Sequence, residues 1–154
     1  MKVLHFAFGD TAANPYLPHN HVPNCVVYTG THDNDTTLGW FASRESEERE
    51  VIEAYLGHRC DEPCWDLIRL AFASVADTAI VPVQDVLCLG SESRMNIPGT
   101  PEGNWEWRLK PGLLTSDLAR RLRRTTALYG RLSTPRVRLS DLADSDEDPS
   151  PQAG

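Results

Sequence analysis

The sequence predicts an α/β protein built on parallel strands, and two observations support this class. Short apolar runs that indicate buried strands alternate with segments of helical periodicity. Polar clusters follow the carboxyl ends of these apolar runs. Alternation of this kind is typical of parallel sheets covered by helices. Because ligands and catalytic groups in such folds gather at the carboxyl ends of strands, these clusters are the candidate sites.

The first half of the chain supplies two of the expected strands. Residues 3–8 form an apolar run that ends at Gly9, and residues 25–29 form a second run that ends at Gly30. Between them, residues 11–24 contain three prolines and several asparagines, which indicate an irregular loop. Residues 31–37 are polar, so a second loop should follow the second strand.

Two helices are expected next. Ser46 can cap the first, and the acids that follow it favour the positive end of the helix dipole. Its apolar face comprises Val51, Ile52, Tyr55 and Leu56, and Gly57 can end it. Pro63 suits the first turn of the second helix. Its inward face comprises Trp65, Ile68, Phe72 and Val75.

The last third of the chain contains one strand, a long loop and a helix. Residues 79–83 predict a third buried strand, although Pro82 cannot donate to a ladder. Residues 90–112 are rich in Gly, Pro and Asn, and a loop of that length in a small domain is usually functional or disordered. Thr115 can cap the final helix and Gly130 can stop it. Its apolar face comprises Leu118, Leu122 and Tyr129.

Length and charge limit the class of protein. The 154 residues carry a net charge of -7, which excludes a strongly basic nucleic-acid binder. No apolar run is long enough to span a membrane, and the start lacks a signal-peptide pattern, so a cytoplasmic protein is expected. Residues 141–154 are acidic, with no Lys or Arg, and predict a disordered tail after one domain at 1–140.

A run of arginines precedes that tail, and it allows two interpretations. It could be a nucleic-acid patch that the acidic tail masks, or a solvated helix face. The second is favoured because no aromatic side chains are interleaved for stacking on bases. The arginines are Arg120, Arg121, Arg123, Arg124, Arg131, Arg136 and Arg138.

Four cysteines raise the question of a zinc site or disulfides. Cys60 and Cys64 form one close pair next to His58, but a structural zinc site usually has a second close pair of ligands. Cys25 and Cys88 stand alone within apolar runs. Reduced thiols are therefore expected, and no metal is assigned.

The segment after the second strand carries the most chemistry. It delivers His32, Asp33, Asn34 and Asp35 from the end of a buried run. The glycine and distal glutamate of a calcium loop are out of register, and no G-x-S-x-G motif supports a serine nucleophile. Composition alone favours a polar Asx-rich turn between a strand and a helix.

The motifs nevertheless resemble those of a known family. TGTHDNDT at 29–36 is similar to the signature after the seventh barrel strand of the 4-α-glucanotransferases, the amylomaltase or disproportionating enzymes of glycoside hydrolase family 77. Further blocks resemble the family in the right order, over residues 1 to about 129. They are MKVLHFAF at 1–8, NPYLPHN at 14–20, SVAD at 74–77, IVPVQD at 80–85, RMNIPGT at 94–100 and NWEWR at 104–108.

The resemblance implies a fold and a reaction. The fold is a (β/α)8 TIM barrel, of which this chain would hold about strands six to eight and their helices, an incomplete C-terminal portion. The family transfers segments of α-1,4-glucan to glucose or to another glucan, with retention and with no cofactor. Such chemistry uses a nucleophilic carboxylate and an acid/base carboxylate, and passes through an oxocarbenium-like state.

The resemblance also implies roles for particular residues. Asp33 matches a third, catalytic carboxylate that stabilises the transition state, and His32 matches a neighbour that binds the same sugar. Asn96 and Pro98 match substrate-lining loop positions. Asp10 lies where the family has a sugar-binding acid, but the register departs there. Trp105 and Trp107 could stack on glucan, although hydrophobic side chains that anchor the loop are favoured.

The family's nucleophile and acid/base lie on strands four and five, which would precede residue 1. Three strands of eight cannot close a barrel. A truncated gene, an internal start and one part of a split enzyme completed by an upstream chain are therefore all open. The chain alone is expected to be inactive. A non-catalytic glucan-binding or interaction remnant is the alternative.

Overall fold

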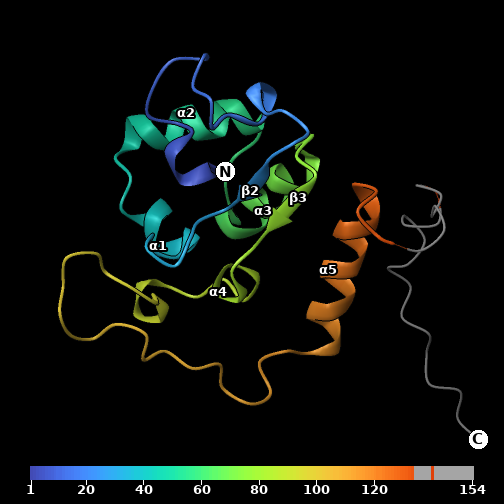
Figure 1. Cartoon of the computed structure of the whole chain (residues 1–154). Helices are drawn as coiled ribbons and strands as arrows, with labels where there is room; N and C mark the ends of the chain where they lie inside the picture. The colour runs from blue at the N-terminus through green and yellow to red at the C-terminus, as the bar shows by residue number, and fades with distance from the viewer. Residues whose placement is uncertain (134–139, 141–154) are drawn as a thin grey trace, which may run out of the picture.

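The protein contains a parallel sheet of three strands (Figure 1), in a computed structural model that describes residues 1–133 and 140. The strands are β1 (Lys2–Val3), β2 (Val26–Tyr28) and β3 (Thr78–Ile80), in the order β1-β2-β3. Val3 pairs with Tyr28, and Tyr28 pairs with Ile80. The α/β class with parallel strands is confirmed.

Five α-helices lie within the described residues. They are α1 (Thr37–Ala42), α2 (Ser46–Leu56), α3 (Pro63–Ala73), α4 (Val83–Val86) and α5 (Ser116–Leu128). Short 3₁₀ helices occur at Leu4–Phe6, Pro18–Asn20 and Ser91–Ser93. The long segment between α4 and α5 sweeps away from the sheet before α5 begins, drawn in yellow to orange (Figure 1).

The core lies on one face of the sheet. Val27 is fully buried and lies in the same core as Leu67 and Ile68 of α3. Because successive side chains of a strand point to opposite faces, the neighbours of Val27 point to the other face. That face is less well covered, since Ile80 is 43% exposed.

All three strands are shorter than the apolar runs suggested, and β2 loses one residue at each end. β1 ends at Val3, and the chain turns into a 3₁₀ helix in which Leu4 and His5 are both buried. The run at 79–83 is divided, because β3 ends at Ile80 and Pro82 becomes the N-cap of α4. A proline lacks the backbone N–H that donates to a neighbouring strand, so it disfavours a strand. It is tolerated at the start of a helix, where that N–H would have no partner within the helix.

Helix boundaries follow the sequence signals with two corrections. Gly57 ends α2 in a left-handed conformation, Pro63 begins α3 and Thr115 caps α5, as predicted. The cap of α2 is Glu45 rather than Ser46, because Glu45 and Glu48 form a reciprocal capping box. Val51 and Val75 are exposed, the latter because α3 ends at Ala73.

The basic stretch is partly structural. Arg121 forms a double hydrogen bond with Glu62 and stacks 4.0 Å over the ring of Trp65. Arg131 donates to the carbonyl oxygens of Phe72, Ser74 and Ala76. These arginines tie α5 and the chain after it to α3. Arg121 is still 43% exposed, in agreement with the predicted solvated helix face, whereas Arg131 is half-buried beyond the end of α5. Arg136, Arg138 and the predicted tail at 141–154 lie outside the described residues.

The cysteines are all free, with Cys60 and Cys64 buried and the other two half-buried. Burial and the neighbouring Asp66 raise the pKa of Cys60 to about 12, which keeps this thiol protonated at neutral pH. Within residues 1–133 and 140 the structure brings together no group of three or more potential metal ligands among His, Cys, Asp and Glu. None of the helices in that part of the chain is long and apolar enough to cross a membrane.

Candidate active site

The candidate site is the loop that leaves the carboxyl end of β2. Thr31 donates from its backbone N and its hydroxyl to Oδ1 of Asn34, at 2.9 and 2.8 Å. The backbone N of Asn34 donates back to the carbonyl oxygen of Thr31 at 3.0 Å. This Asx-type turn presents the two residues within it, His32 and Asp33, to solvent, with side chains 55% and 51% exposed.

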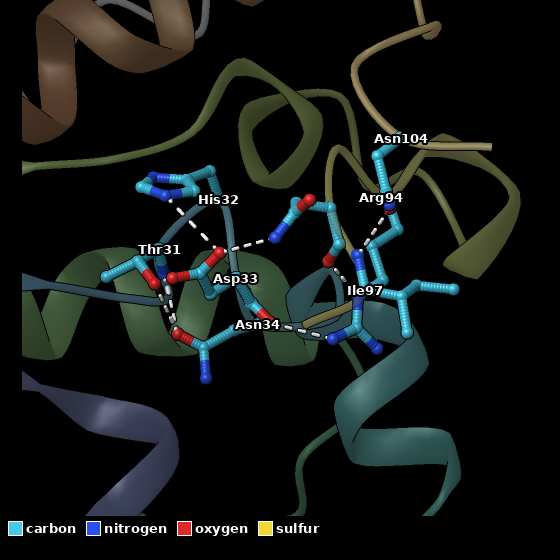
Figure 2. Close-up of polar contacts among 8 residues, drawn as sticks. Thr31, His32, Asp33, Asn34, Arg94, Ile97 and Asn104 are labelled. Carbon is cyan, nitrogen blue, oxygen red and sulfur yellow. Dashed lines mark hydrogen bonds and ion pairs between the residues drawn. The ribbon is translucent and has the colours of Figure 1, made fainter. Parts of the chain in front are cut away.

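The Asp33 carboxylate is held on one side by two polar groups (Figure 2). Asn96 donates from Nδ2 to Oδ1 of Asp33 at 2.7 Å. Nε2 of His32 lies 3.3 Å from the same oxygen. Both contacts favour a fixed carboxylate orientation, and the sequence-predicted residues Asp33, His32 and Asn96 therefore come together.

Arg94 joins the two loops that carry these residues. Its Nη2 donates to the carbonyl oxygen of Asp33 at 2.7 Å, and its Nε donates to the carbonyl oxygen of Asn96 at 2.8 Å. Figure 2 shows the guanidinium beside the Asp33–Asn34 backbone. The motif at 94–100 includes Arg94 but does not indicate a role for it. Every residue has a backbone carbonyl, so contacts with carbonyl oxygens cannot be predicted from residue types.

A second link joins the same loops. The hydroxyl of Ser91 donates to Oδ2 of Asp35 at 2.7 Å. A β-carbon on Gly39 would lie 2.1 Å from the Ser91 hydroxyl and 2.7 Å from Asp35 Oδ2. Glycine at this position is therefore what lets the loop after α4 approach the start of α1.

A buried carboxylate supports the loop from below. Asp85 is 1% exposed and accepts hydrogen bonds from Thr29 Oγ1 at 2.5 Å, Thr37 N at 2.8 Å and Thr37 Oγ1 at 2.8 Å. Burial raises the pKa of Asp85, and the bonds from both threonines oppose that rise. Asp85 thus joins α4 to the two ends of the loop that carries Asp33.

His5 completes this support. Its ring stacks 4.6 Å from Trp40, and Nε2 lies 3.0 Å from Thr37 Oγ1. Because the Thr37 hydroxyl proton goes to Asp85, Nε2 of His5 must carry the proton of this bond. Burial, with Arg44 nearby, lowers the pKa of His5 to about 3, so the ring is neutral. A β-carbon on Gly30 would lie 2.6 Å from this ring.

The loop borders a cavity of about 440 Å³ at the carboxyl ends of the strands. Its apolar lining residues are Met1, Tyr28, Ile80, Pro82 and Met95. Its polar lining residues include His32, Asp33 and Arg94. Such a cavity suits a ligand that has hydroxyl groups on its edges and an apolar face.

Comparison with known proteins identifies the family. A family model described as 4-alpha-glucanotransferase matches residues 1–115. The chain belongs to the 4-alpha-glucanotransferase family. A 4-alpha-glucanotransferase of Synechocystis is 55% identical over 133 residues, which cover 85% of this chain and 26% of that protein. A 4-alpha-glucanotransferase of Thermus thermophilus is 50% identical over 140 residues, covering 86% and 28%.

A solved structure supports the same assignment. An amylomaltase from Streptococcus agalactiae, in complex with acarbose, is 38% identical with a TM-score of 0.80. The alignment covers 85% of this chain and 27% of the amylomaltase chain. This chain therefore spans about a quarter of the length of the proteins that it resembles.

Other residues singled out in the sequence lie apart from Asp33. Pro98 is exposed and does not line the 440 Å³ cavity, so the structure does not bring it to the carboxylate. Asp10 borders a separate cavity of about 220 Å³ with Trp40 and Arg44. The expectation that Trp105 anchors its loop is wrong, because this side chain is exposed beside His32.

Proposed function

We propose that this chain forms one side of the active site of a 4-alpha-glucanotransferase that transfers α-1,4-glucan segments to glucose or to another glucan. Asp33 is the carboxylate that stabilises the oxocarbenium-like transition state, and His32 and Asn96 bind hydroxyls of the same sugar. Pro98 is proposed to line the substrate path on the same loop as Asn96. The observation that carries the proposal is the Asp33 carboxylate held by Asn96 and His32 at the end of β2.

The chemistry explains why Asp33 needs this setting. A retaining transfer develops positive charge on the sugar, and a fixed negative charge beside it lowers the barrier without prior reorganisation. An aspartate clamped by two polar neighbours meets that need. The same reaction also needs a nucleophile and an acid/base, with carboxyl groups about 5–5.5 Å apart.

Other acids near Asp33 suit neither of these two roles. The Asp35 carboxylate accepts a hydrogen bond from Ser91, and Asp85 is buried beneath the threonines. We therefore assign the nucleophile and the acid/base to polypeptide outside this sequence. That polypeptide would add strands beside β1 and β3, whose outer edges have no partner within the described residues, and complete a TIM barrel.

The substrate range follows from the same assignment. Maltooligosaccharides are uncharged, and a cavity lined by both apolar and polar side chains suits their sugar rings. The proposed reaction uses no cofactor or metal ion, and the proposed partners include no nucleic acid or membrane. A cytoplasmic location stays a prediction.

The decisive experiment is disproportionation of maltotriose, followed by release of glucose. We expect none from the chain alone. We expect release when the chain is co-expressed with the part of the Synechocystis relative that precedes the matched segment. Glucose release by the pure chain would overturn the assignment of the two missing carboxylates, and a complex without activity would overturn the role of Asp33.

A second candidate, a glucan-binding protein without turnover, is favoured by one observation. The Asp33, His32 and Asn96 arrangement is present in this chain without the other acids. Calorimetry with maltoheptaose would then show binding by the chain alone. Absence of any heat of binding in this titration would exclude a glucan-binding function of the chain alone.

A further inference from the structure

Trp105 has an unusual position for so large an apolar side chain. It is 51% exposed, whereas Trp65 is 3% exposed and packed in the core. Its ring centroid lies 5.0 Å from that of His32, with the two planes tilted by 40°. Trp105 therefore extends the surface beside the Asp33 carboxylate with an apolar face.

The backbone holds Trp105 there in a strained conformation. Its φ is 63°, a left-handed value that bulky residues rarely adopt because it is strained. The Trp105 N–H donates to the carbonyl oxygen of Met95 at 2.7 Å. Arg108 donates from Nη1 to the carbonyl oxygens of Trp105 and Trp107, at 2.7 and 2.8 Å.

The preceding residue closes the loop that leads to Trp105. Oδ1 of Asn104 accepts from the backbone N of Ile97 at 2.7 Å, and Nδ2 donates to the carbonyl oxygen of Thr100 at 2.9 Å. Figure 2 places Asn104 next to Ile97 and on the Arg94 side of the site. Strain maintained by several hydrogen bonds, around a side chain that gains little burial, points to a role in binding.

The surroundings of the ring indicate the class of ligand. A groove of about 700 Å³ runs beside it and is lined by Asn96, Thr100, Glu102, Asn104 and Glu106 among others. One flat apolar ring among amides, hydroxyls and carboxylates suits a ligand that alternates apolar faces with hydroxyl edges. A protein partner would instead favour a contiguous apolar patch.

We infer that Trp105, with His32 at its edge, stacks on the apolar C–H face of a glucose unit next to the sugar that Asp33 contacts. This inference rests on the proposed function and adds a second sugar position to it. Asn96 lies between the two positions, since it donates to Asp33 and lines the groove beside Trp105. A glucan bound at both positions therefore runs from the Asp33 carboxylate along the loop at 96–105.

The test is the affinity of the 154-residue chain for maltoheptaose, measured by titration calorimetry. The variants are Trp105→Ala, Trp105→Phe and, as a matched control, Trp107→Phe, since Trp107 is half-buried in the same segment. Removal of a stacking face should raise Kd about tenfold. We expect this for Trp105→Ala, less than threefold for Trp105→Phe, and no change for Trp107→Phe.

Asn96→Ala separates failure of this inference from failure of the proposed function. If Asn96→Ala weakens binding and Trp105→Ala does not, the stacking role of Trp105 is wrong and the site at Asp33 stands. If neither variant changes Kd, the sugar site itself is wrong and the inference falls with it. If the chain alone binds no maltoheptaose, the same variants are compared by their KM for maltoheptaose in the assembly with the preceding part of the Synechocystis relative, and the same two outcomes decide. Because the Trp105 side chain is half exposed, unchanged circular dichroism is expected for its variants.

Discussion

At the residue scale, the site depends on how one carboxylate is oriented. One oxygen of the Asp33 carboxylate accepts a hydrogen bond from Asn96. The backbone carbonyl of Asp33 accepts a hydrogen bond from Arg94. The sequence indicated Asp33, His32 and Asn96 through a family motif, and the structure brings these side chains together. Arg94 could not be predicted, because its partners are carbonyl oxygens that every residue possesses.

Arg94→Lys tests the link between the two loops. A lysine ammonium is a single compact donor and cannot span the carbonyl oxygens of Asp33 and Asn96 as a guanidinium does. We expect the Kd for maltoheptaose to rise roughly fivefold to tenfold, since each lost hydrogen bond contributes about 1 kcal/mol. Titration calorimetry measures it.

Arg59→Lys is the control for that change, because Arg59 is exposed and paired only with the exposed Asp61 among the residues that the structure describes. Its affinity should equal that of the unchanged chain. Equal affinities for Arg94→Lys and Arg59→Lys would show that the loops hold each other without the guanidinium.

At the element scale, β2, α1 and α4 meet around a small buried polar network. Asp85 of α4 accepts from Thr29 and Thr37, and Thr37 accepts from the neutral His5 ring. The sequence predicted β2 and the turn after it. It did not predict α1, since a helix of six residues containing Gly39 gives little periodicity, and its start depends on the Thr36 cap.

Gly30→Ala should destabilise this network. The new methyl group would lie 2.6 Å from the His5 ring, and that ring is fixed by its stacking on Trp40. Overpacking of this kind typically costs about 1–3 kcal/mol. We expect a lower midpoint in urea unfolding.

Gly9→Ala is the matched control for that substitution, because a β-carbon at Gly9 meets nothing within 4 Å. A midpoint for Gly30→Ala that matches the control would mean that His5 can move at little cost.

The neutral state of His5 makes stability depend on pH. The folded pKa of about 3 lies below the ordinary value of 6.5, so between these values the unfolded chain binds more protons. The contribution of His5 to the free energy of unfolding is fully present above about pH 6.5. It is lost as pH falls towards about 3, at up to about 1.4 kcal/mol per pH unit. His21, whose pKa burial also lowers, acts in the same direction.

Urea unfolding of the chain and of His5→Gln between pH 7 and pH 4 isolates the His5 contribution. The glutamine amide can still donate to Thr37 but does not titrate. We expect a shallower loss of stability in the variant. Parallel curves would indicate that His5 is not the group responsible.

At the scale of the whole molecule, the two faces of the sheet have different surroundings. α3 covers the face that contains Val27, while Tyr28 and Ile80 line the site cavity on the other face. Sequence patterns identified the parallel class correctly. They overestimated the lengths of β1 and β3. The apolar run at 3–8 continues as a 3₁₀ helix after Val3, and Pro82 is the N-cap of α4.

The central claim is that this chain supplies the transition-state carboxylate of a glucanotransferase, and Asp33→Asn tests it most directly. The asparagine keeps the shape and removes the charge, so an interaction made chiefly in the transition state should be lost. In the assembly with the preceding part of the Synechocystis relative, we expect kcat for maltotriose disproportionation to fall at least about 100-fold. The KM should change less than about threefold. Unchanged kcat, or equal losses in kcat and substrate affinity, would contradict the claim.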